Sequence, residues 1–299
     1  SEVGSGSAFG FTLELALAAQ TPGRAVNKPG SDASRTPKGS HPFKVLVAED
    51  NVINQRLIVS MLERAGYVPT LVSGGKQAID EAVRGNYDAV LMDVQMPEID
   101  GLEATAAIRE AERSTGRHVP IVAMTALALP GDQALCLASG MDAYLSKPIR
   151  MDSLIRKIEA CALGVFDGTG ESGKTNPIVK GDHKMIEMDY DAALARVGGD
   201  VELLAELAGL FLEEYPQLME SARTGLTDGK PEQAHSSAHQ LKGLLAQFGA
   251  ERAREVAFQV ESASRRSEVE TALQSLAELE RLMALLRPEL ERTAGAGAD

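Results

Sequence analysis

The stretch AVLMDVQMP (residues 89–97) is a short apolar run that leads into an acid, Asp93. Similar runs recur before and after it, at residues 43–48, 67–72, 119–124 and 143–145. Amphipathic stretches of helical length separate these runs, at residues 52–65, 76–84, 102–113, 132–139 and 152–160. Short apolar runs that alternate with helices predict a parallel sheet covered on both faces. We therefore expect an α/β domain with five parallel strands.

Three carboxylates follow two of these runs. Glu49 and Asp50 come after the first run, and Asp93 ends the third. Five βα units fit the flavodoxin-like strand order, in which the first and third strands are neighbours, so the three acids should meet at the carboxyl edge of the sheet. Like charges this close repel one another and need a cation. Oxygen ligands favour a hard divalent ion, and we predict Mg²⁺ as the cofactor.

Two further polar residues end later strands. Thr125 closes the fourth apolar run, and Lys147 follows the fifth, just before Pro148. With a metal shielding the charge, Asp93 would attack phosphorus while Thr125, Lys147 and the metal held the peripheral oxygens. Any one of these residues is more often a solvated turn residue. Their combination at successive strand ends favours phosphoryl transfer, provided that the Asp93 carboxylate lies near Asp50 and within reach of solvent.

Four segments resemble response-regulator receiver domains. They are VLVAEDNVINQRL (45–57), VLMDVQMPEIDGLEATAAIR (90–109), IVAMTA (121–126) and YLSKPI (144–149). The resemblance covers roughly residues 42–163. It implies that Asp93 accepts a phosphoryl group, that Glu49 and Asp50 serve Mg²⁺ with Asp93, and that the backbone carbonyl of Gln95 is a further ligand.

The same resemblance implies roles for the later strand ends. Thr125 and Tyr144 would form the switch pair that responds to phosphorylation, and Lys147 would hold the phosphoryl group. The bond between Lys147 and Pro148 would be cis. Glu49, where the family often has an aspartate, is a common variation.

The C-terminal block shows the 3.6-residue period of helices with one buried face, which predicts an all-α helical bundle. Within it, His239 and Lys242 share a face beside the apolar stripe that contains Leu241 and Leu245. We expect this face to be wetter than the stripe, so that the Lys242 ammonium can attract a phosphoryl group. A neutral imidazole nitrogen is a competent nucleophile near pH 7.

Two segments of this block resemble histidine phosphotransfer domains, AHQLKGLLAQFGA (238–250) and GGDVELLAELAGLFLEEYP (198–216). The resemblance runs roughly over residues 185–290 and implies that His239 is a second phosphoacceptor. It is moderately specific alone and stronger behind a receiver domain. His235 lies four residues before His239, a spacing that suits zinc on a helix, but the sequence supplies no third ligand, so we disfavour the zinc alternative.

GTGESGKT (168–175) matches the phosphate-binding loop G-x-x-x-x-G-K-[ST]. That loop functions between a buried strand and a helix, and the following Pro177 and Gly181 oppose a helix. We therefore expect a linker, with a nucleotide hydrolase as the alternative. A second alternative is a regulatory receiver switch in which His239 takes no part.

The composition bounds the remaining possibilities. The net charge of −13 argues against nucleic acid as a partner. The two cysteines, Cys136 and Cys161, lack metal-ligand spacing and are expected to be buried, reduced thiols. We see no signal peptide and no segment of the ~20 apolar residues that a membrane helix needs. These features favour a cytoplasmic chain without direct membrane contact, although a parent kinase could be membrane-anchored.

Two stretches rich in Pro, Gly, Ser and Lys, 21–41 and 164–184, read as linkers that border the receiver region at 42–163, and residues 291–299 read as a tail. Residues 1–20 resemble the end of a histidine-kinase ATP-binding domain, which implies the C-terminal part of a hybrid histidine kinase. We expect an upstream kinase domain to phosphorylate Asp93 and His239 to pass the group to a downstream response regulator. The chain lacks the ATP-binding acids, so we expect no autophosphorylation from ATP.

Overall fold

A computed structural model of the chain describes residues 43–125, 130–162 and 188–296. All of these described residues belong to one compact unit. The predicted kinase remnant at 1–20, both predicted linkers and the loop GTGESGKT lie outside the described residues.

A five-stranded parallel sheet forms the first half of this unit. Its strands are β1 (Lys44–Ala48), β2 (Val68–Val72), β3 (Ala89–Asp93), β4 (Ile121–Thr125) and β5 (Ala143–Ser146). Their order is β2-β1-β3-β4-β5, and every neighbouring pair is parallel. β3 and β4 are buried along their whole length, as expected for strands covered on both faces. The predicted α/β fold is confirmed.

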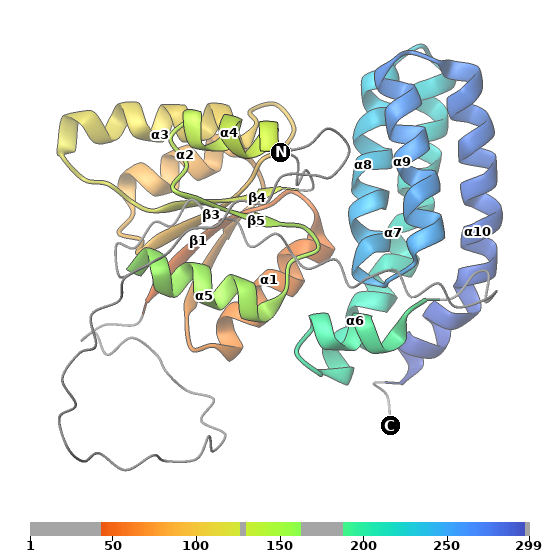
Figure 1. Cartoon of the computed structure of the whole chain (residues 1–299), viewed down its shortest axis with the longest axis horizontal. Helices are drawn as coiled ribbons and strands as arrows, with labels where there is room; N and C mark the ends of the chain where they lie inside the picture. The colour runs from red at the N-terminus through yellow and green to blue at the C-terminus, as the bar shows by residue number, and fades with distance from the viewer. Residues whose placement is uncertain (1–42, 126–129, 163–187, 297–299) are drawn as a thin grey trace, which may run out of the picture. The chain divides into compact units, whose positions relative to one another are not determined.

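Helices cover both faces of the sheet, as Figure 1 shows. They are α1 (Val52–Arg64), α2 (Gly75–Arg84), α3 (Gly101–Thr115), α4 (Pro130–Ala138) and α5 (Met151–Ala162). Alternate residues of each strand point to opposite faces. Val45 and Leu91 therefore pack in the cluster that includes α1 and α5, whereas Leu46 and Met92 pack with α2 and α3 in a second cluster.

The loop from β3 to α3 is shaped by two local features. Asp100 and Glu103 form a capping box, in which each side chain accepts from the backbone N–H of the other residue. Gly101 leaves room for the strand end, because a Cβ atom there would lie 2.1 Å from the carbonyl oxygen of Asp93. Helix α3 can therefore begin directly against the end of β3.

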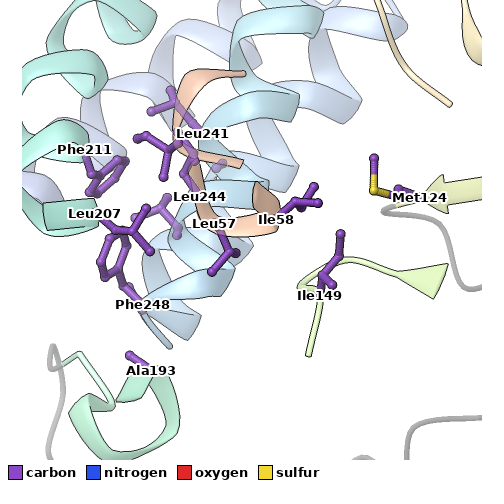
Figure 2. Close-up of a cluster of buried hydrophobic side chains, with 14 of the residues drawn as sticks. Leu57, Ile58, Met124, Ile149, Ala193, Leu207, Phe211, Leu241, Leu244 and Phe248 are labelled. Carbon is purple, nitrogen blue, oxygen red and sulfur yellow. The ribbon is translucent and has the colours of Figure 1, made fainter. Parts of the chain in front are cut away.

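The second half is helical, with α6 (Tyr190–Arg196), α7 (Val201–Thr227), α8 (Pro231–Gln247), α9 (Glu251–Arg265) and α10 (Val269–Gly295). The last four form a bundle, in which α8 contacts α7 and α9, and α10 contacts the same two helices (Figure 1). Figure 2 shows part of its apolar core, where the rings of Phe211 and Phe248 stack with centroids 5.2 Å apart. The predicted helical bundle is confirmed.

The segment predicted as a tail, residues 291–299, begins inside helix α10, which continues to Gly295. Leu290 and Thr293 are buried on its inner face, and Glu289 accepts a hydrogen bond from the backbone N–H of Met188 at 2.8 Å. Packing against the bundle therefore holds the last turns in place.

Cys136 and Cys161 are both buried, as predicted. Among residues 43–125, 130–162 and 188–296, none of the helices has the length and apolar character needed to cross a bilayer.

Candidate functional site

The carboxyl edge of the sheet brings the three predicted acids together. β1 pairs with β3, so Glu49 and Asp50, which follow β1, lie beside Asp93 at the end of β3. One carboxylate oxygen from each residue lies within 4.8 Å of the other two. In the part of the chain that the structure describes, this is the one group of acids, histidines or cysteines with the geometry to hold a metal ion.

Lys147 bridges two of these acids. Its Nζ donates to Oε2 of Glu49 at 2.8 Å and to Oδ2 of Asp93 at 2.7 Å. Burial by itself lowers the pKa of Lys147, because it disfavours the charged ammonium. The attraction of the Glu49 and Asp93 carboxylates is stronger than this effect, so the pKa of Lys147 is raised. The lysine is therefore a fixed positive charge just after β5. The peptide bond from Lys147 to Pro148 is cis, as the resemblance implied.

Asp93 is more buried than the sequence led us to expect. Its side chain keeps 6% of its exposure, because it ends a fully buried strand and Lys147 covers its carboxylate. Burial raises the pKa of Asp93, and the Lys147 ammonium opposes that effect. Burial followed by repulsion from Glu49 raises the pKa of Asp50 to about 6. The raised pKa values of Asp93 and Asp50 mean that further negative charge at this edge of the sheet is unfavourable unless a cation neutralises it.

The remaining predicted residues of the first site lie on β4, on β5 and in the loop after β3. Thr125 ends β4, next to β3, and Tyr144 pairs with Ala123 one strand further on. Thr125 and Tyr144 therefore project from the same face of the sheet, since Ala123 and Thr125 are two residues apart. The backbone N–H of Gln95 donates to Oδ1 of Asp93 at 3.3 Å.

The donor set fits Mg²⁺. The three acids offer only oxygen atoms, the ligand that Mg²⁺ prefers. Neighbouring groups orient one of them, because the Asn54 amide donates to Oε1 of Glu49 at 2.7 Å. Within the described ranges no histidine or cysteine joins the group, which disfavours a softer metal.

His239 lies on α8 and is largely enclosed, with 14% of its side chain exposed. Its Nδ1 lies 2.6 Å from Oε1 of Glu261, a buried acid on α9. Burial lowers the pKa of His239; the hydrogen bond to Glu261 opposes this, and the nearby Lys242 ammonium adds to it. The imidazole is therefore neutral near pH 7, which leaves a lone pair on one of its ring nitrogens.

The prediction that Lys242 lies on a solvent-exposed face of α8 is wrong. Lys242 is buried with 7% exposure, and its Nζ donates to Oε2 of Glu261 at 2.6 Å. The same ammonium lies 5.5 Å from the centre of the Phe258 ring. Helix α9 packs over this face of α8 and supplies both partners, which the period of α8 alone does not reveal.

The zinc alternative finds no support. The rings of His235 and His239 are 6.5 Å apart, and Nδ1 of His235 faces the backbone oxygen of Glu261 at 3.3 Å. Over the residues with described positions, no metal-binding group includes either histidine.

A cavity of about 350 Å³ is lined by His239 and by two residues that neighbour Asp93 in the predicted metal site. Asp50 and Gln95 line it from the sheet domain, and His239 and Gln240 line it from α8. The Gln240 amide donates to Oδ2 of Asp50 at 3.2 Å. Helix α1 also contacts α7, and Arg56 of α1 donates two hydrogen bonds to the Glu206 carboxylate of α7.

The sheet domain and the helical bundle each match a known protein family. The response regulator receiver domain family matches residues 45–159, and the Hpt domain family matches residues 206–289. The polar-differentiation response regulator DivK of Brucella anthropi is 36% identical over 119 residues, which cover 40% of this chain and 95% of that protein.

Two longer relatives are matched over smaller shares of their own length. Hybrid signal transduction histidine kinase I of Dictyostelium discoideum is 51% identical over 113 residues, 36% of this chain and 6% of that protein. Sensor protein GacS of Pseudomonas syringae pv. syringae is 32% identical over 222 residues, 71% of this chain and 24% of that protein.

Proposed function

Since the chain belongs to the response-regulator receiver family and continues into an Hpt domain, the two domain types of a two-component phosphorelay, we propose that it accepts a phosphoryl group on Asp93 and relays it through His239. The observation that carries this proposal is the cluster of Glu49, Asp50 and Asp93 with the Lys147 ammonium inside it. Such a cluster suits metal-assisted transfer of a phosphoryl group to a carboxylate.

In the first step, an oxygen of Asp93 attacks the phosphorus of a phosphohistidine on an upstream kinase domain. The O–P bond forms, the N–P bond breaks, and the electron pair stays on the departing imidazole. Lys147 would hold one peripheral oxygen and Thr125 another. Glu49, Asp50, Asp93 and the Gln95 carbonyl would hold Mg²⁺, which supplies charge neutralisation at the phosphoryl oxygens when bound.

In the second step, Nε2 of His239 attacks the acyl phosphate. The N–P bond forms and the O–P bond breaks, which returns Asp93 to a carboxylate. Nδ1 keeps its proton, so the phosphorylated ring carries positive charge beside Glu261. Both phosphorylated forms are high in transfer potential, so the step is reversible, and the aspartate of a downstream response regulator takes the group from His239.

We further propose that the kinase core lies outside this chain. The segments matched in the longer relatives are small parts of those proteins, which fits a chain that acts as the phosphotransfer portion of a hybrid sensor histidine kinase. We place its action in the cytoplasm, where the ATP-dependent kinase domain would operate.

Labelling with a small acyl-phosphate donor tests the relay. The protein is incubated with Mg²⁺ and the labelled donor, and acid-labile and alkali-labile label are mapped in wild type, Asp93→Asn and His239→Gln. We expect label on both residues in wild type, label on Asp93 alone in His239→Gln, and none on His239 in Asp93→Asn.

Other outcomes identify the alternatives. Label on Asp93 that never reaches His239 would favour a switch without relay, in which Thr125 and Tyr144 respond to phosphorylation. Turnover of ATP that requires Lys174 would favour the hydrolase at residues 168–175. Either result would contradict the relay.

A further inference from the structure

Two consecutive residues after β1 meet bundle side chains of opposite hydrogen-bonding character. The Gln240 amide of α8 donates to Oδ2 of Asp50 at 3.2 Å. The Glu214 carboxylate of α7 accepts from Nδ2 of Asn51 at 2.6 Å. The bundle therefore presents a donor to the acid and an acceptor to the amide that follows it.

The orientation of the Asn51 amide is fixed by the helix that it begins. Asn51 is the N-cap of α1, and its Oδ1 accepts from the backbone N–H groups of Ile53 and Asn54, both at 3.0 Å. Because the cap uses the oxygen, the amide cannot be turned over without the loss of both bonds. The Nδ2 group is the part of the side chain that remains for the bundle, and Glu214 is its acceptor.

The contact between Asn51 and Glu214 is enclosed. Asn51 is 4% exposed, so an Nδ2 group without an acceptor would have little water to replace it. Burial raises the pKa of Glu214; the bond from the Asn51 amide opposes this rise, and the Asp50 carboxylate adds to it. A further carboxylate at position 51 would face Glu214 where water screens little of the repulsion.

We propose that Glu214 is a specificity-determining residue of the bundle, which selects receiver domains that carry a hydrogen-bond donor directly after the acidic pair. The metal site needs the acid at position 50, so that position cannot distinguish one receiver from another. Residue 51 is not one of the three clustered acids, and several residue types can cap a helix. This inference rests on the proposed relay, because it names the class of receiver that exchanges phosphoryl groups with His239.

The choice between asparagine and aspartate at position 51 shows how the selection operates. Both residues cap a helix about equally well, so either one preserves the start of α1. Asparagine then offers a donor to Glu214, whereas aspartate offers a second oxygen that the Glu214 carboxylate repels. A bundle with glutamine at position 214 would accept the aspartate, because the glutamine amide can donate to that oxygen.

Exposed ion pairs between the same two helices discriminate less. The side chains of Arg56 and Glu206 are 42% and 44% exposed, so salt screens their attraction. The enclosed contact of Asn51 with Glu214 is screened much less. Selection by Glu214 should therefore persist at salt concentrations that remove the contribution of the exposed pair.

The test measures transfer from Asp93 to His239 in the full chain with Asn51→Asp, with Glu214→Gln and with both changes. Each chain is labelled by a small acyl-phosphate donor at saturating Mg²⁺. The rate at which label appears on His239 is divided by the label on Asp93. This ratio removes any effect that a new charge beside Asp50 has on acceptance itself.

At about pH 8, where carboxyl groups are ionised, we expect Asn51→Asp to slow transfer about tenfold, which corresponds to ~1.4 kcal/mol. Glu214→Gln alone should stay near wild type, because its side-chain carbonyl still accepts from Asn51. The double variant should regain most of the lost rate. The loss in Asn51→Asp should remain in high salt.

Matched controls change the same residue types at exposed positions. Glu213→Gln alters the neighbouring glutamate of α7, and Asn86→Asp alters an asparagine before β3, at the opposite edge of the sheet. Both should transfer at the wild-type rate. Glu214→Ala leaves the receiver unchanged and serves if Asn51→Asp takes up no label; loss of the acceptor should slow transfer about fivefold, or ~1 kcal/mol.

Three results would overturn the selection by Glu214. They are a wild-type rate in Asn51→Asp, a wild-type rate in Glu214→Ala, and a double variant as slow as Asn51→Asp alone. The proposed relay fails separately: if wild-type protein carries label on Asp93 and none on His239, the relay itself is wrong. If His239 is labelled normally and positions 51 and 214 have no influence, only the selectivity is lost.

Discussion

Lys147 is the residue on which the charge balance of the carboxylate cluster depends. Its ammonium lies within 2.8 Å of oxygens of both Glu49 and Asp93. A divalent cation entering the same cluster competes with this ammonium for the same oxygens. Lys147 should therefore weaken Mg²⁺ binding while it favours phosphoryl acceptance.

Replacement of Lys147 by methionine tests this division of roles. We expect Lys147→Met to bind Mg²⁺ roughly tenfold more tightly, because the carboxylates lose their internal counter-charge. Acceptance of phosphate by Asp93 should nevertheless become slower, since a donor to the phosphoryl oxygens is gone. Titration calorimetry and acyl-phosphate labelling measure the two effects. Lys76→Met, at an exposed lysine of α2, is the control, and unchanged Mg²⁺ affinity in Lys147→Met would contradict the argument.

The site residues that were predictable from sequence are those at strand ends. Parallel strands place their carboxyl ends at one edge, so the convergence of Glu49, Asp50 and Asp93 follows from the alternating pattern alone. Glu261 left no such signal, because α9 carries several glutamates and only the rotation of α9 against α8 decides which one meets His239. The burial of Lys242 was missed for the same reason.

At the scale of elements, helix α1 connects the sheet domain to the bundle. Asn51 caps its first turn by accepting from the backbone N–H groups of Ile53 and Asn54, both at 3.0 Å. Arg56 and Arg64 then extend from α1 to acids at positions 206 and 200, which lie on α7 and at its N-cap. A basic helix against acidic side chains is an arrangement that favours one docking partner over others.

Reversal of one ion pair tests this electrostatic match. Arg56→Glu places two negative charges together, so we expect transfer from Asp93 to His239 to slow by about fivefold at low salt, or ~1 kcal/mol. Adding Glu206→Arg to the same chain should restore most of the rate, because the pair is re-formed with opposite sign. The effect should shrink in high salt, since both side chains are partly exposed.

The control for this reversal is Arg287→Glu, which breaks an exposed pair with Glu291 inside α10. It should leave the transfer rate unchanged. A double variant as slow as Arg56→Glu alone would show that the pair does not guide docking.

The strands and helices of the sheet domain were predictable to within a few residues, because apolar periodicity decides them. The end of helix α10 was not predictable in this way. The composition of residues 291–299, rich in Ala and Gly, favours a tail, yet Leu290 and Thr293 find buried positions that prolong α10. Tertiary packing overrides local preference there.

At the scale of the whole molecule, the relay is expected to occur within one chain. Gln240 bonds to Asp50, and His239 lines the same cavity as Asp50 and Gln95, an arrangement that favours transfer from Asp93 to His239 within one copy. A tethered partner also acts at a high effective concentration, about millimolar for a short flexible linker. The sequence allows transfer within one chain but does not predict it. The number of residues between the two domains limits how far apart they can lie, and it does not indicate which of their surfaces come into contact.

Mixing two inactive chains distinguishes transfer within a chain from transfer between chains. Asp93→Asn keeps only His239, and His239→Gln keeps only Asp93, so the mixture can label His239 only by contact between copies. At about micromolar protein, well below a millimolar effective concentration, we expect the mixture to label His239 at least tenfold more slowly than wild type. The wild-type rate should also stay constant on dilution. A mixture as fast as wild type, or a wild-type rate proportional to protein concentration, would show that the phosphoryl group passes between molecules.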